Sequence, residues 1–275
     1  MVSSYNCKTK YPIVLIHGTG FKDRKHINYW GRIPQALKND GATVFYGYQD
    51  AWGTVENNAV IIRDRITEIL DQYGCEKVNL IAHSKGGMES RYAISTLGMA
   101  DKIASLTTIA TPHKGSKTID VLHNKLNPVF KFLAFFVNKF FMILGDREPD
   151  FYTVTRQFST PYTKEFNKKN PDSELVYYQS YAAVMKNSFS DITMVIPHSV
   201  VGFIEGENDG LVTPESAAWT NFKGIIKSST NRGISHADEV DLRRKRFTGK
   251  TEVEGVTDIV DVYIKIVSDL KDMGY

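Results

Sequence analysis

The chain has 275 residues, 42% of them hydrophobic, which is enough apolar material to bury one large core. Its formal net charge of +3 is too small to indicate a nucleic-acid-binding protein, and the densest basic run, residues 243–246, is typical of a solvated face. There is no repeat, low-complexity tract or Pro/Gly/Ser-rich linker, so we expect a single domain over residues 1–275.

The first half of the chain alternates predicted strands with predicted helices. Residues 11–16 form a continuous apolar run, typical of a strand buried on both faces of a parallel sheet, and residues 43–46 and 103–109 predict two more strands. Helices are predicted at 34–39, which begins with a proline, and at 54–73, where a threonine can cap the first turn. This alternation predicts an α/β fold, with a mostly parallel sheet covered by helices on both faces.

A serine lies at the sharpest break in this pattern. The apolar run 78–82 ends just before Ser84, and a helix-compatible stretch follows at 88–97. Strand, turn with serine and helix are the context of a nucleophile elbow, which also needs small flanking residues, here Ala82 and Gly86. The pattern is short, so a plain polar loop between a strand and a helix remains an alternative.

The alternation stops after residue 115. Residues 116–173 are rich in Pro, Phe and Lys and predict an inserted cap. Strands are predicted again at 175–178 and 224–226, and an amphipathic helix at 256–270 closes the chain.

The order of candidate residues along the chain fits a catalytic triad. In an α/β hydrolase the nucleophile, the acid and the histidine follow one another in that order. Asp209 lies in a tight-turn sequence after the strand at 175–178, and His236 is the one histidine downstream of it. A surface histidine is the competing interpretation of His236. In the triad, His236 would accept the proton of Ser84 and Asp209 would orient the imidazole.

Two backbone N–H groups are candidates for an oxyanion hole. One belongs to Lys85, the residue after the nucleophile. The other belongs to Thr19, in the glycine-containing turn 17–20 after the first strand, which could equally be a plain turn.

Five stretches in this order resemble the family I bacterial triacylglycerol lipases of the α/β-hydrolase fold: residues 11–18, 77–84, 111–116, 208–212 and 236–240. The resemblance gives Ser84, Asp209 and His236 the triad roles and implies a serine carboxylic-ester hydrolase, most consistent with a lipase acting on acylglycerols. A short-chain esterase, a phospholipase A1 or an acyltransferase would use the same residues, and a catalytically inactive binding protein is the alternative outside enzymes. We expect a monomer acting at an oil–water interface, without cofactor for the chemistry.

The resemblance also implies one structural calcium ion beside the histidine loop. Asp238 and Asp191 match its two carboxylate ligands, with backbone carbonyls near Leu242 and Arg246. Two ordinary surface aspartates are the alternative. Some relatives bind zinc through histidines inserted before the nucleophile. Residues 47–76 contain no histidine, so no zinc is expected.

The termini and the cysteines bear on cellular location. The first ten residues are polar and lack the apolar segment of a signal peptide. We expect a secreted protein whose signal has been removed, with a cytoplasmic protein as the alternative.

Cys7 and Cys75 precede strands that neighbour each other in the hydrolase sheet, so a disulfide is geometrically feasible, although two free thiols are favoured.

A mobile lid is predicted at residues 118–146. From 129 to 144 every residue is apolar except three, which share one narrow stripe of a helix. Sixteen residues reach about 24 Å, too short to span a bilayer, so no integral membrane span is expected. A buried core helix is a second alternative. The lid hypothesis predicts that the opposite face packs onto the active site in water, through Phe132, Phe135, Phe136 and Phe140.

Overall fold

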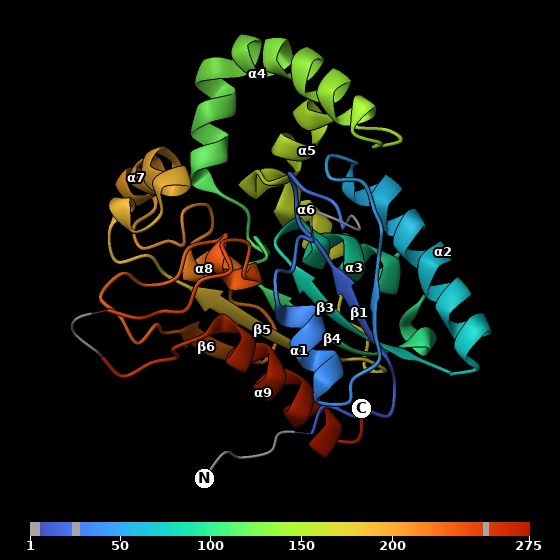
Figure 1. Cartoon of the computed structure of the whole chain (residues 1–275). Coiled ribbons are helices and arrows are strands. Elements are labelled where there is room, and N and C mark those ends of the chain that lie inside the picture. The colour runs from blue at the N-terminus through green and yellow to red at the C-terminus, as the bar shows by residue number, and fades with distance from the viewer. Residues whose placement is uncertain (1–5, 24–27, 250–252) are drawn as a thin grey trace.

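A computed structural model describes residues 6–23, 28–249 and 253–275. Six strands form one sheet in the order β2-β1-β3-β4-β5-β6, and every adjacent pair is parallel (Figure 1). The expected parallel sheet is therefore confirmed. The strands are β1 (Ile13–Ile16), β2 (Val44–Tyr46), β3 (Val78–His83), β4 (Ile103–Ile109), β5 (Tyr177–Ala183) and β6 (Phe222–Ile226).

Helices cover both faces of this sheet, as Figure 1 shows. Alternate residues of β1 divide between two cores: Ile13 and Leu15 pack with α1 (Ile33–Asn39) and α9 (Ile259–Asp272), whereas Val14 and Ile16 pack with α2 (Val55–Tyr73). This division follows from the two-residue period of a strand, and both sides are apolar because both are buried. The remaining helices are α3 (Lys85–Ser95), α4 (Lys117–Ile143), α5 (Phe151–Gln157), α6 (Thr160–Lys169), α7 (Val195–Ile204) and α8 (Pro214–Ala217).

The second half of the sheet departs from the sequence-based boundaries. The predicted strand 175–178 begins two residues before β5 does. It also ends too soon, because β5 continues to Ala183 through the polar residues Gln179 and Ser180. Both are buried and satisfied: Gln179 donates to the Thr107 hydroxyl over 2.8 Å, and Ser180 donates to the Trp219 carbonyl over 3.1 Å. Helix α7 was not predicted at all.

Helices α4, α5 and α6 lie between β4 and β5, within the segment predicted as a cap. The long α4 forms an arch at the top of the view in Figure 1. Its course bends at Leu126, whose φ of −120° and ψ of 22° are not helical, two residues before Pro128. Proline lacks an N–H and restricts the residue before it, so a bend is expected there.

Both ends of α4 are attached to the body of the protein. At its start the Glu205 carboxylate accepts hydrogen bonds from the Ser116 hydroxyl, over 2.6 Å, and from the Thr118 N–H, over 2.8 Å. Just beyond its end Asp146 accepts from the Trp52 N–H over 2.9 Å and pairs with Lys22 at 3.2 Å. We call these two attachments the first and second foot of the arch.

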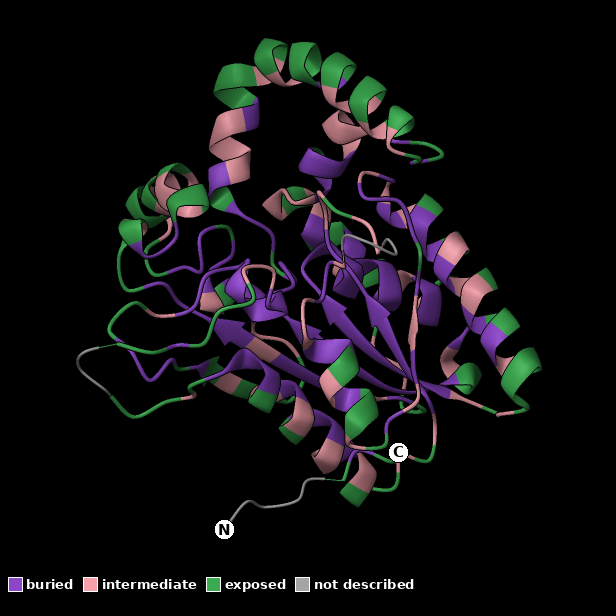
Figure 2. Ribbon diagram, in the orientation of Figure 1, coloured by how far each residue is buried: buried purple, intermediate pink, exposed green. Residues whose placement is uncertain are grey.

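The apolar face of α4 points to solvent rather than to the active site. Phe132, Phe135, Phe136 and Phe140 are 53–66% exposed, and the outer surface of the arch is exposed in Figure 2. The predicted packing of this face onto the site is therefore wrong for this structure. The physical reason is that the other side of α4 packs on α5, where the Phe151 N–H donates to Asn138 over 2.8 Å and the Tyr152 hydroxyl donates to Asn127 over 3.2 Å.

With 27 residues, α4 is long and apolar enough to cross a membrane, and 6% of its most apolar window is buried. The sixteen-residue estimate from the sequence was therefore too short. Length and composition alone are weak evidence for a span, and the two feet return both ends of α4 to the same body. Cys7 and Cys75 are both free thiols.

Candidate active site

Ser84 lies between the end of β3 and the start of α3, in a strained backbone conformation. Its φ of 54° and ψ of −128° fall outside the regions that residues with a Cβ normally adopt. Gly86 permits this turn, because a Cβ there would lie 2.5 Å from the carbonyl oxygen of Ile16. The strand, the strained serine and the helix have the geometry of a nucleophile elbow.

Asp209 and His236 are brought together from loops that follow β5 and β6. His236 Nδ1 lies 2.8 Å from Asp209 Oδ2, and the His236 N–H donates to the Asp209 carbonyl over 2.8 Å. The other carboxylate oxygen of Asp209 accepts from the N–H groups of Leu211 and Val212, each over 2.8 Å. These bonds fix the carboxylate, which in turn fixes the imidazole with Nε2 directed away from Asp209.

His236 also lies beside the elbow. Its ring centroid is 4.4 Å from that of His83, the residue immediately before Ser84. Within the described residues no hydrogen bond joins the Ser84 hydroxyl to His236, so the structure forms the histidine–acid half of the predicted triad, and His236 contacts the residue that precedes the serine. Such bonds often tighten only when substrate binds.

The residues predicted for the oxyanion hole border Ser84. Gly18, one residue before Thr19, lies so close that a Cβ on it would be 2.7 Å from the Ser84 Cβ. Lys85 is the first residue of α3, so its N–H has no partner within the helix. Across the described parts of the chain, neither the Thr19 nor the Lys85 N–H donates a hydrogen bond, and both are therefore free to bind a developing oxyanion.

A buried polar network supports this loop from behind. Gln49 donates to the His17 carbonyl over 2.9 Å and to Glu89 over 3.3 Å. The Lys85 ammonium pairs with Glu89 and donates to the Gly53 carbonyl over 2.7 Å, and both side chains of the pair are fully buried. Burial raises the pKa of Glu89, although Lys85 opposes the shift.

Sequence reasoning missed a second histidine–carboxyl pair at the site. His83 Nε2 lies 2.9 Å from Glu239 Oε2, and His83 Nδ1 lies 2.7 Å from the Tyr29 hydroxyl. Burial, followed by the charge of His236, lowers the pKa of His83, and burial, followed by the charge of Asp209, raises the pKa of Glu239. Both shifts favour the uncharged form of the group. Glu239 follows His236 by one helical turn, which is the signal that could have identified it.

The two aspartates expected to bind calcium do meet, but a cation of the protein lies between them. Arg243 Nε donates to Asp238 Oδ1 over 2.8 Å and lies 3.4 Å from Asp191 Oδ2. The expectation that residues 243–246 form a solvated face is therefore wrong for Arg243, whose side chain is 24% exposed. The predicted calcium donors do not fit an ion while this arginine holds them. Among the described residues, His83, His236 and Glu239 lie close enough together to hold a metal ion, but they belong to the network above.

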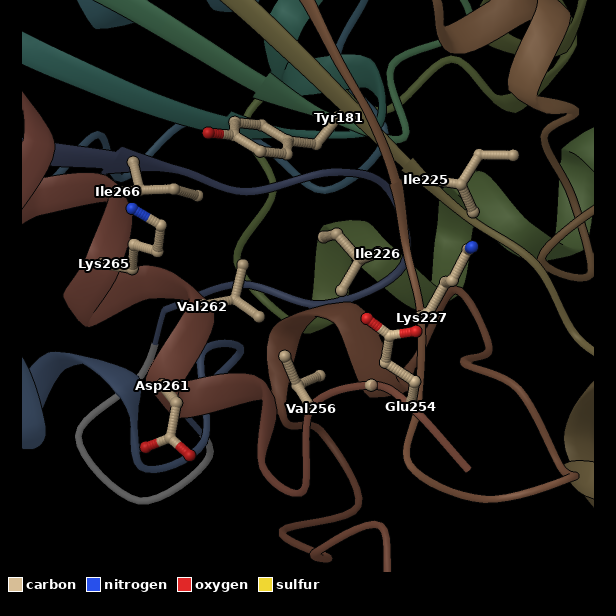
Figure 3. A pocket seen from close by; sticks show the side chains of 11 residues that line it. Tyr181, Ile225, Ile226, Lys227, Glu254, Val256, Asp261, Val262, Lys265 and Ile266 are labelled. Carbon is tan, nitrogen blue, oxygen red and sulfur yellow. The ribbon is translucent and has the colours of Figure 1, made fainter. Parts of the chain in front are cut away.

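An apolar hollow of about 420 Å³ lies between the β5–β6 edge of the sheet and α9 (Figure 3). Tyr181, Ile226, Val262 and Ile266 line it. None of the predicted catalytic residues is among its lining residues, so it is separate from the candidate active site.

Comparisons with known proteins agree with this geometry. The family described as alpha/beta hydrolase fold matches residues 11–206. Triacylglycerol lipase 2 of Saccharomyces cerevisiae is 30% identical over 264 residues, covering 90% of this chain and 75% of the yeast protein. A triacylglycerol lipase of Pseudarthrobacter phenanthrenivorans is 31% identical over 181 residues, but the match covers 61% of this chain and 56% of that protein.

Among solved structures, the mature form of a Bacillus licheniformis lipase superposes with a TM-score of 0.62 at 21% identity. The superposition covers 86% of this chain and 88% of the other. At this identity the likeness concerns the fold.

Proposed function

Because the chain belongs to the alpha/beta-hydrolase lipase family, we propose that it is a serine ester hydrolase that cleaves acylglycerols through an acyl-enzyme on Ser84. The observation that carries this proposal is the Asp209–His236 hydrogen bond of 2.8 Å beside a serine held at a φ of 54°. We treat residues 1–275 as one hydrolase domain, with about 116–173 as its inserted cap.

In the proposed reaction, His236 Nε2 takes the proton of the Ser84 hydroxyl as its oxygen attacks the ester carbonyl carbon. The carbonyl oxygen gains negative charge and accepts hydrogen bonds from the Thr19 and Lys85 N–H groups, each typically worth about 2.7–4 kcal/mol in the transition state. Collapse of this intermediate breaks the bond to the alcohol, which leaves with the proton from His236. Water then hydrolyses the acyl-enzyme by the same steps, with His236 again acting as base.

Asp209 supports both steps. Its carboxylate holds the proton of the neutral imidazole on Nδ1, so Nε2 is free to act as base. It also stabilises the imidazolium that forms when His236 accepts the proton. No metal ion takes part in this proposal, and the calcium ion implied by the resemblance is not included, since Arg243 already holds the two aspartates.

We further propose that α4 contacts the lipid phase. Its exposed phenylalanines form an apolar surface that is costly in water, because each 100 Å² of apolar area costs about 2.5 kcal/mol. The same helix also carries positive charges that attract negatively charged lipid surfaces and the fatty-acid anions released by hydrolysis. These charges belong to Lys117, Lys125, Lys131 and Lys139.

The activity is tested with p-nitrophenyl esters of rising chain length and with emulsified triolein. The lipase proposal expects hydrolysis of long-chain esters and of triolein, and a loss of at least about 10³-fold in Ser84→Ala. Full activity in Ser84→Ala would contradict the mechanism, and a sharp optimum at acetate would make the protein a short-chain esterase.

The role of α4 is tested with Phe136→Asp on two substrates. The variant should lose far more activity on emulsified triolein than on soluble p-nitrophenyl butyrate. The matched control is Phe45→Asp on β2, a partly buried phenylalanine of the core, which should reduce both activities together through lost stability. Equal losses for Phe136→Asp would contradict a lipid-contacting role.

A further inference from the structure

The loop that carries His236 is held by a cluster of buried charges. Asp191 and Asp238 are 0% and 5% exposed, and they come from segments 47 residues apart, 238 − 191. Two carboxylates buried at one place repel each other and are costly to desolvate unless a cation lies with them. In this chain the cation is the guanidinium of Arg243.

Arg243 contacts both sides of the cluster at once. Its Nε and one terminal nitrogen bind the two oxygens of Asp238 as a fork, while Nε lies 3.4 Å from Asp191 Oδ2. Its other terminal nitrogen donates to the Ser190 carbonyl over 3.2 Å. The planar guanidinium thus joins the Ser190–Asp191 segment to the turn that contains Asp238, which a single ammonium could not do in the same geometry.

The remaining positions of the two carboxylates are also taken. Asp191 accepts from the Ser235 hydroxyl over 2.6 Å and from the Thr193 hydroxyl over 2.8 Å, and Asp238 accepts from the Ser235 N–H over 3.3 Å. Ser235 directly precedes His236 in the chain. Calcium requires six to eight oxygen ligands at 2.3–2.6 Å. The oxygens of these two carboxylates are already bound by protein donors and are not free to serve as such ligands.

We propose that Arg243 is a built-in replacement for a divalent cation and that this protein holds its His236 loop without calcium. Arg243 acts as a positioning residue: it fixes the Ser190–Asp191 segment against the turn that carries Ser235, His236 and Asp238. The inference concerns the loop itself and does not depend on which ester the enzyme cleaves.

The first test uses the unaltered protein. Its melting temperature is measured in 5 mM EDTA, which removes calcium, and in 5 mM CaCl2. This calcium concentration is on the order of what saturates the weak sites of extracellular calcium modules. We expect the two values to agree within about 1 °C. A melting temperature several degrees higher in calcium than in EDTA would overturn the proposal.

The second test removes the cation. In EDTA, Arg243→Met should melt on the order of 5–10 °C below the parent, since it leaves two buried carboxylates unpaired. Calcium should then raise its melting temperature by several degrees, because the freed carboxylates can bind the ion. The matched control is Arg246→Met, which removes a guanidinium from a side chain that is 72% exposed, three residues away, and should gain nothing from calcium.

Two results of this comparison would overturn the proposal: an Arg243→Met protein as stable as Arg246→Met, or one that is destabilised but indifferent to calcium. Should Arg243→Met fail to fold, Arg243→Lys provides the same comparison. It keeps the charge but loses the fork, so we expect a smaller fall in melting temperature and a smaller calcium response. A lysine variant with full parental stability would show that the bridging geometry of the arginine is not needed.

Discussion

The ring centroids of His83 and His236 lie 4.4 Å apart, the rings are tilted by 44°, and the carboxyl group of Glu239 lies beside both. Glu239 Oε2 is 2.9 Å from His83 Nε2 and 3.6 Å from His236 Nδ1. The candidate active site therefore contains two acids beside its catalytic histidine. Only Asp209 is within hydrogen-bonding distance of His236, and this difference leads to the first prediction.

Glu239→Gln should leave kcat/KM within about threefold of the parent, because burial favours the neutral carboxyl and an amide can replace it. Asp209→Asn should lower kcat on the order of 10⁴-fold, because the amide cannot hold the imidazole in the required tautomer. Both are measured with a soluble p-nitrophenyl ester. Equal losses in the two variants would mean that Glu239 carries charge in the reaction.

Lys85→Met should lower the free energy of unfolding by about 3–5 kcal/mol, because it leaves the fully buried Glu89 without its cation. The double variant Lys85→Met/Glu89→Gln should recover part of this loss, since no buried charge then remains unpaired. Urea denaturation at pH 8 measures both. A double variant less stable than the single one would contradict the explanation.

Gly86→Ala should cost about 1–3 kcal/mol of stability and most of the activity, because the new Cβ would meet the backbone oxygens of Ile16 and His17 at 2.5 and 2.6 Å. Gly202→Ala in α7 is the control. Its Cβ would meet nothing nearer than 3.6 Å, so alanine should stabilise the helix by about 0.5–1 kcal/mol. Thermal denaturation compares the two, and similar effects would show that close approach is not what requires Gly86.

The contribution of the buried histidines to stability should fall as the pH falls below about 6.5. Burial lowers the pKa of His17 to about 4, and burial lowers the pKa of His83 and of His113 well below the ordinary value. The unfolded chain therefore binds protons at these histidines below pH 6.5 that the folded chain does not bind. Each one contributes a slope of up to about 1.4 kcal/mol per pH unit. The contribution of these histidines to the free energy of unfolding is fully present above pH 6.5. It decreases as the pH falls from there toward their pKa values in the folded protein.

Asp23, Glu89 and Glu239 oppose this trend, because their raised pKa values make the folded state bind protons that the unfolded state releases. The contribution of one histidine is isolated with His113→Gln. Its unfolding free energy, measured from pH 7 to 5, should fall less steeply than that of the parent. Parallel curves for the two proteins would contradict the assignment of the slope to buried histidines.

The first half of the fold could be predicted from the sequence because its strands are mostly apolar and alternate regularly with helices. The strand predicted at 103–109 has the bounds of β4, and Thr54 caps α2 as expected, accepting from the Asn57 N–H over 3.2 Å. The run that precedes Ser84 was equally clear. These strands are buried on both faces, so apolar residues dominate their sequences even though β4 also holds the buried Ser105 and Thr107.

The elements that were missed are those in which tertiary contacts override local pattern. Helix α7 contains Pro197 within its first turn and several β-branched residues, which argue against a helix on propensity alone. The outward direction of the α4 phenylalanines follows from the packing of the other side of the helix on α5, through Asn138 and Asn127, and no local pattern in the sequence shows this packing. The position of Arg243 between the two aspartates likewise could not be predicted, because the sequence does not show which side chain of the basic run 243–246 points inward.

The two feet of α4 restrict how this helix can move. A flap turns about one hinge and releases its free edge, but an arch attached at both ends has no free edge. Its span can change only by bowing, and Leu126, the one residue of the helix with non-helical dihedral angles, is the point at which it bends most easily. A change in the course of α4 is then confined to its bend near Pro128, since the helix is also joined to α5 through Asn138.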